Sequence, residues 1–227
     1  MTVQPLRRRR AARGSGDQLR DEILDATTDL LMETGHEKAV SIRSVAQCVG
    51  VTPPSVYLHF ADKDALLDAV CARYFERLDE VMRQVAAEQP STIDRLRAQG
   101  LAYVRFATQT PEMYRIATMG ESRPGSDVDV ALNSSAFAHM RNTIESLIEE
   151  GVYPAGDPTV AALELWTVAH GVASLLISRP YLPFGDVDEF ADRVMCAVCC
   201  GHIAYGVMGP ELPPRDAIAR LKRLADE

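Results

Sequence analysis

Residues 41–66 read SIRSVAQCVGVTPPSVYLHFADKDAL, which predicts two short helices joined by a tight turn. Ser41 is a typical N-cap for a helix over 42–49, and Gly50 follows where the turn needs a positive φ. Thr52 precedes a second helix, which two prolines can begin because first-turn amides lack acceptors within the helix. A residue before proline avoids helical geometry, so this start can shift by one residue. A helix pair of this size can lay its second helix in the DNA major groove.

The side chains of this stretch divide into three roles. Val51, Val56 and Phe60 are predicted to face inward as anchors. Small and hydroxyl-bearing side chains of the second helix suit base edges, and aromatic and basic ones suit phosphates. The predicted DNA contacts are Ser41 and Arg43 for one backbone, Thr52, Pro54 and Ser55 for bases, and Tyr57, His59 and Lys63 for phosphates, with Pro53 as a further DNA-contacting residue. Each residue alone fits the plain surface of a helical bundle, but the ordered set favours DNA contact.

The stretch also resembles a known family. The resemblance to the DNA-binding domain of TetR/AcrR-type transcriptional regulators lies in the series Ile42-x-x-Val45-Ala46-x-x-Val49-Gly50-Val51-Thr52-x-Pro54-Ser55-Val56-Tyr57-x-His59-Phe60-x-Asp62-Lys63-x-Ala65-Leu66. It implies a homodimer on double-stranded operator DNA, with half-sites about 34 Å apart. It also implies base contacts from the third helix, phosphate contacts from Tyr57, His59 and Lys63, and a ligand-sensing C-terminal domain.

The whole chain fits an all-α protein, because its apolar residues recur at three- and four-residue steps. Its net charge of -8 is unevenly distributed: residues 1–63 hold nine of the 24 Lys/Arg and eight of the 32 Asp/Glu, which leaves 15 and 24 for the remainder. The acidic excess therefore lies away from the proposed DNA-reading end. No run approaches the roughly 18 consecutive apolar residues of a membrane span. Five cysteines without a regular framework fit a reducing cytoplasm.

Three parts are predicted along the chain. Residues 1–16 form a disordered basic arm, which is either a solvated tail or a DNA-contacting segment. Residues 17–62 form the helix-turn-helix domain, whose first helix covers 17–34. Residues 63–227 form a helical ligand-binding and dimerisation domain. Its helices are predicted at 63–87, 92–109, 111–118, 128–150, 157–178, 187–208 and 214–225.

Aromatic and thioether side chains of the C-terminal part suit an adaptable apolar pocket, although at helical spacing such residues first of all form core. The predicted ligand-binding residues are Tyr103, Phe106, Met113, Tyr114, Phe137, Met140, Trp166 and His170. The pattern Trp166-x-x-x-His170-Gly171 resembles one TetR subgroup that is named for those three letters. Arg105 and His139 are further polar candidates. The expected effector is a small apolar or aromatic molecule.

The helices over 157–178 and 187–208 carry small residues that permit close packing, and the family resemblance favours them as the homodimer interface. Cys196, Cys199, Cys200 and His202 lack a second ligand pair at zinc-finger spacing, so no metal or other cofactor is expected. No phosphate loop or nucleophile–base motif indicates an enzyme. The prediction is a cytoplasmic, ligand-released repressor. The alternatives are a constitutive DNA-binding regulator, an activator, a scaffold without DNA binding, and a recombinase-like enzyme.

Overall fold

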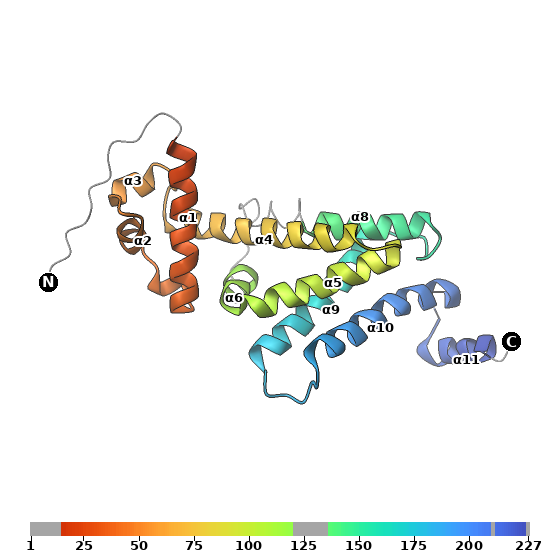
Figure 1. Ribbon diagram of the computed structural model, residues 1–227. Helices are drawn as coiled ribbons and strands as arrows, with labels where there is room; N and C mark the ends of the chain where they lie inside the picture. Colours follow the sequence, from red (N-terminus) through yellow and green to blue (C-terminus); the bar gives the residue numbers. More distant parts are fainter. Residues whose placement is uncertain (1–14, 120–135, 210–211, 226–227) are drawn as a thin grey trace. The chain divides into compact units, whose positions relative to one another are not determined.

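The computed structural model describes residues 15–119, 136–209 and 212–225, and these are helical throughout apart from the connecting segments (Figure 1). The elements are α1 (Ser15–Thr34), the 3-10 helix η1 (Glu37–Ala39), α2 (Ile42–Val49), α3 (Pro53–Tyr57), α4 (Lys63–Ala87), α5 (Thr92–Gln109), α6 (Pro111–Met119), α8 (Ala136–Glu149), α9 (Pro158–Ser178), α10 (Val187–Met208) and α11 (Pro214–Ala225). The predicted all-α class is confirmed. The predicted basic arm before residue 15, and the part of the predicted helix 128–150 before residue 136, lie outside the described residues.

The chain divides into two compact units. The first unit comprises Met1–Arg77 and Thr110–Ser134, and the second comprises Leu78–Gln109 and Ser135–Glu227. The division falls within α4, so this helix begins in the first unit and ends in the second.

Local sequence explains the helix ends of the first unit. The Ser44 N–H donates to Ser41 Oγ at 3.1 Å, and the Ser41 N–H donates to Ser44 Oγ at 2.9 Å, which is a reciprocal capping box for α2. Gly50 ends α2 with φ 76°, the left-handed conformation that glycine adopts without a Cβ clash. Gly35 stops α1 in the same way, with φ 73°. The start and end of α2 and the end of α1 therefore lie at the residues predicted from the sequence.

The core of the first unit holds the helix-turn-helix together. α1 packs on α2, α2 packs on α3, and α6 also contacts α1. Ile23, Leu31, Val45 and Val56 are fully buried, and Phe60 is almost so. Burying a side chain of this size contributes about 1.5–3 kcal/mol. The core thus fixes the direction in which the short α3 presents its outer face.

The second unit is a bundle in which α5 contacts α8, α9 and α10 (Figure 1). Its fully buried side chains include Ile144 and Leu147 of α8 and Ala162 and Ala173 of α9. At Gly100 an added Cβ would stand 3.0 Å from Met195 Sδ, so α5 and α10 approach closely there. Small residues therefore set the helix spacing in this bundle.

Helix α9 is the most apolar helix of the bundle. By length and composition alone it could cross a membrane, although a third of its apolar window is buried inside the protein. It packs on α5, α8 and α10, as the core helix of a helical domain does. The sequence predicted no membrane span, because no run approaches roughly 18 consecutive apolar residues.

Candidate nucleic-acid interface

The outer face of α3 and the residues that follow it form the candidate interface. α3 is only five residues long and begins at the first of the two prolines, with Thr52 before it. The hydroxyls of Thr52 and Ser55 lie 3.0 Å apart, which brings the two predicted base-contacting oxygens together. Val56 and Phe60 point into the core as predicted, and Val51 is half-buried.

Solvent exposure differs among the predicted DNA contacts. Tyr57 is 53% exposed, and Arg43 of α2 is also exposed. His59 is half-buried beside the backbone turn in which its N–H donates to the Val56 carbonyl at 3.0 Å. Leu58 is 84% exposed, the highest value among the exposed large hydrophobic side chains of the described residues. Leu58 was not among the predicted DNA contacts, although its position two residues after the buried Val56 places it on the outer face.

Two predicted contact residues also have structural partners. Ser41 caps α2, so its hydroxyl is engaged by the Ser44 amide. The Lys63 Nζ donates to the Glu37 carbonyl oxygen at 2.6 Å and thereby joins the start of α4 to η1. Both side chains stay at the surface, but their positions are set by the fold itself.

Two arginines outside the predicted contact set, Arg20 and Arg73, connect parts of the first unit. The guanidinium carbon of Arg20 lies 5.2 Å from the centroid of the Phe60 ring, within cation–π range. Arg73 pairs with Asp25 at 2.8 Å and donates to Thr28 Oγ1 at 3.3 Å, which joins α4 to α1 within the first unit. Arg20 was not among the predicted site residues, since nothing local in the sequence pairs it with a ring 40 positions away.

The predicted ligand-binding residues fall into both units. Met113 and Tyr114 are buried in the first unit. In the second unit four residues form an aromatic cluster: Tyr103 Oη lies 3.3 Å from His170 Nδ1, Trp166 lies 5.7 Å from the His170 ring, and Phe137 meets Trp166 edge-on at 6.5 Å. Met140 is buried on α8 and Phe106 is half-buried on α5.

The chemistry of this aromatic cluster is that of a neutral, apolar environment. Burial lowers the pKa of His170, so its imidazole is uncharged near neutral pH. The uncharged imidazole and the phenol hydroxyl are hydrogen-bonding groups among aromatic rings. This combination is typical of sites for small aromatic molecules. Within the described ranges, no three His, Cys, Asp or Glu side chains are grouped to hold a metal ion.

Two family models match this chain. Residues 23–70 match the family described as bacterial regulatory proteins, tetR family, and residues 96–198 match the tetracyclin repressor-like C-terminal domain. The transcriptional regulator EthR of Mycobacterium tuberculosis is 27% identical over 185 residues, which is 78% of this chain and 85% of EthR.

Solved structures share the fold. A protein of unknown function from Rhodococcus sp. RHA1 superposes with a TM-score of 0.72 at 26% identity, over 82% of this chain and 95% of that one. RolR in complex with resorcinol gives a TM-score of 0.63 at 18% identity, over 88% and 97%. Together with the helix-turn-helix geometry and the two matching families, these similarities show that the chain belongs to the TetR family of DNA-binding transcriptional regulators, which are not enzymes.

Proposed function

We propose that this protein is a cytoplasmic, homodimeric repressor that leaves its operator when a small apolar or aromatic molecule binds the second unit. The aromatic cluster of Tyr103, Phe137, Trp166 and His170 is the observation that carries the ligand part of this proposal. The operator-binding part rests on the exposed outer face of α3.

DNA contact is proposed for the nine predicted residues in the roles that their positions support. Thr52, Pro54 and Ser55 read base edges, and Tyr57 and His59 hold phosphates. Lys63 lies in the first turn of α4, where free amides favour an anion. Its bond to a carbonyl still leaves two ammonium protons for a phosphate. Leu58 adds an apolar surface beside Tyr57 that suits a thymine methyl.

Dimerisation is proposed through α9 and α10. α9 exposes Val160, Leu163 and Leu175, and α10 exposes Tyr205 and Val207. These apolar side chains are 46–56% exposed within the described chain, and a second copy would remove them from water. Gly171 is half-buried on α9 with no heavy atom within 4 Å of a built Cβ, which leaves room for a close helix contact.

The switch would act through α4, which begins beside the helix-turn-helix and ends in the ligand-binding unit. An effector shifts an equilibrium only by its differential affinity for two states. A ligand that binds one arrangement of the second unit better would therefore change the population of the dimer that fits both half-sites. RolR, which has the same fold, has been solved with the aromatic ligand resorcinol.

The experiment uses Trp166, the one tryptophan of the chain, as a reporter inside the aromatic cluster. Operator DNA is selected from a random pool, and its release is followed by anisotropy while a panel of aromatic molecules is titrated. An effector is expected to change Trp166 emission and to release DNA over the same concentration range.

Variants separate the proposal from its alternatives. Tyr103→Phe and His170→Gln are expected to weaken effector binding about five- to tenfold each, because the first removes the phenol hydroxyl and the second replaces the imidazole ring with a flexible amide. Operator affinity without ligand stays unchanged in both. If no molecule that changes Trp166 emission also releases DNA, the protein is a constitutive regulator. If operator-dependent transcription is stimulated, the protein is an activator.

A further inference from the structure

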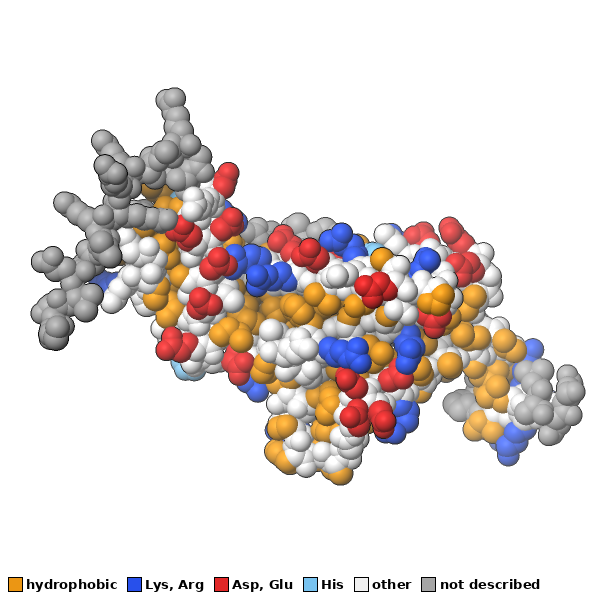
Figure 2. Space-filling view, viewed as in Figure 1, with side chains coloured by type: hydrophobic (Ala, Val, Ile, Leu, Met, Phe, Trp, Pro, Cys, Tyr) orange, Lys and Arg blue, Asp and Glu red, His pale blue; other side chains and the backbone are white. Residues whose placement is uncertain are grey.

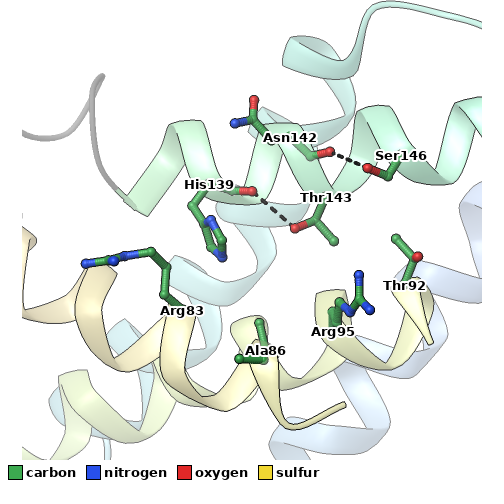
Figure 3. Close-up of a pocket in the computed structure, with 9 residues that line it drawn as sticks. Arg83, Ala86, Thr92, Arg95, His139, Asn142, Thr143 and Ser146 are labelled. Carbon is green, nitrogen blue, oxygen red and sulfur yellow. Dashed lines mark hydrogen bonds between the residues drawn. The ribbon is translucent and has the colours of Figure 1, made fainter. Parts of the chain in front are cut away.

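A polar hollow lies in the second unit, away from the aromatic cluster. It measures about 300 Å³ and is bounded by the last turns of α4, the first turn of α5 and one side of α8 (Figure 3). Helix α8 separates the two regions. At 100° per residue, His139, Asn142 and Ser146 lie on the opposite side of α8 from Phe137 and Ile144.

The hollow is rich in groups that bind anions. Arg83 and Arg95 both line it, and no carboxylate is found among the described side chains of its wall. Arg83 donates from Nε to Asp79 at 2.9 Å, so its charge is partly matched. Arg95 forms no ion pair with any described residue, and Figure 3 shows its side chain rising from α5 toward Thr143.

His139 supplies a second donor. Its ring points from α8 into the hollow (Figure 3), and its Nε2 is buried without a hydrogen-bond partner among the described residues. Burial lowers the pKa of His139, so the imidazole is neutral and one ring nitrogen carries a proton. A buried ring nitrogen without a partner is unfavourable, and with its proton on Nε2 the imidazole would donate to a bound acceptor.

The neighbouring polar side chains of α8 form hydrogen bonds along their own helix. Arg141 donates to Asn142 Oδ1 at 2.9 Å, which leaves the amide N–H₂ of Asn142 as a donor. Thr143 donates its hydroxyl proton to the His139 carbonyl at 3.1 Å and accepts from the Gln99 amide at 3.0 Å, and Ser146 donates to the Asn142 carbonyl at 3.2 Å. Ala86 forms an apolar part of the floor.

We infer that this hollow binds a small organic anion, a carboxylate or a phosphate monoester, through Arg95 and His139. The volume is at the lower end of small-molecule sites and suits a short apolar tail on Ala86. A guanidinium and an oxyanion form the stronger, charge-assisted kind of hydrogen bond. The inference goes beyond the proposed aromatic effector and does not depend on it.

Calorimetry of the full chain tests it with three aliphatic probes. Hexanoate and monobutyl phosphate carry the anion, and hexanamide is the neutral control. Saturable binding of one anion, at least about tenfold tighter than hexanamide, is expected. Whichever of the two anions binds more tightly identifies the ligand as a carboxylate or a phosphate.

Two variants locate the site. Arg95→Gln is expected to weaken binding about tenfold or more, and His139→Gln about three- to tenfold. Arg223→Gln removes the same charge from the exposed face of α11 and should change nothing. Arg95 is exposed, so a melting temperature equal to that of the wild type confirms folding. Equal affinities in Arg95→Gln and Arg223→Gln, or binding of neither anion, would overturn the inference.

Discussion

Lys63 donates a 2.6 Å hydrogen bond from Nζ to the carbonyl oxygen of Glu37, 26 residues earlier in the chain. The bond ties the start of α4 to the 3-10 turn that precedes α2, so one side chain links the helix-turn-helix to the helix that leaves it. A residue proposed to hold a phosphate is thus already oriented before DNA arrives. Preorganisation of this kind lowers the entropic cost of binding.

Removing this side chain should therefore affect stability and DNA binding together. Lys63→Ala is expected to lower the free energy of unfolding by about 1 kcal/mol, measured by urea denaturation. It should also reduce the slope of log affinity for operator against log salt concentration by the equivalent of about one phosphate contact. Lys38→Ala, an exposed lysine in η1, is the control. Identical unfolding energies and salt slopes in the two variants would refute both roles of Lys63.

The turn of the helix-turn-helix depends on the left-handed backbone of Gly50. Gly50→Ala is expected to cost about 1–2 kcal/mol, since φ is 76° and the built Cβ meets no atom within 4 Å. The whole penalty is then backbone strain. Gly16→Ala adds the same methyl to α1, also in open space but without a positive φ, and should be neutral or slightly stabilising. Thermal unfolding of the two variants compares them, and equal stability would contradict the assigned turn.

The dimer surface can be tested with one methyl group. Gly171→Ala should favour α9 within a single chain, because alanine stabilises a helix interior by about 0.5–1 kcal/mol relative to glycine. If a second copy packs closely on Gly171, the same methyl overpacks that contact and raises the dimer dissociation constant about five- to a hundredfold. Sedimentation over a range of concentrations measures it, with Gly16→Ala as the control. An unchanged dissociation constant would place the interface elsewhere.

The half-buried His170 makes stability depend on pH. Its pKa is lowered by burial from the ordinary 6.5, so the unfolded chain takes up a proton before the folded chain does. The contribution is fully present above about pH 6.5 and is lost as the pH falls below it. Urea denaturation between pH 7.5 and about pH 5 should show stability falling more steeply for the wild type than for His170→Gln. Parallel profiles would mean that His170 is already charged in the folded state.

The sequence predicted the features that depend on neighbouring residues. The bounds of α2, the capping by Ser41, the stop at Gly50 and the burial of Val56 all follow from local rules, and the structure has them. The first helix begins at Ser15, two residues before the predicted start.

The features that the sequence did not predict depend on residues distant in the chain. Lys63 and Glu37 meet only because α1, α2 and α4 pack together, and Arg20 reaches Phe60 for the same reason. The polar hollow takes its wall from α4, α5 and α8, and periodicity within one helix does not show which polar faces converge. His139 was named as a polar candidate for the aromatic pocket, whereas its ring points into the polar hollow.

Figure 2 shows hydrophobic side chains gathered over the turn between α9 and α10, where Tyr181, Leu182 and Val187 are exposed. This apolar turn continues the exposed faces of the two helices. Leu175 lies three residues before the end of α9 and six before Tyr181, so we expect the proposed dimer surface to extend into this turn.

Ligand binding in the aromatic cluster is proposed to control DNA binding. The direct measurement records Trp166 emission and the anisotropy of labelled operator in one titration of the same sample. Trp166 emission and operator anisotropy are expected to change with one midpoint. Tyr103→Phe is expected to shift both midpoints together by about five- to tenfold. A Trp166 signal that saturates while operator affinity stays constant would contradict it.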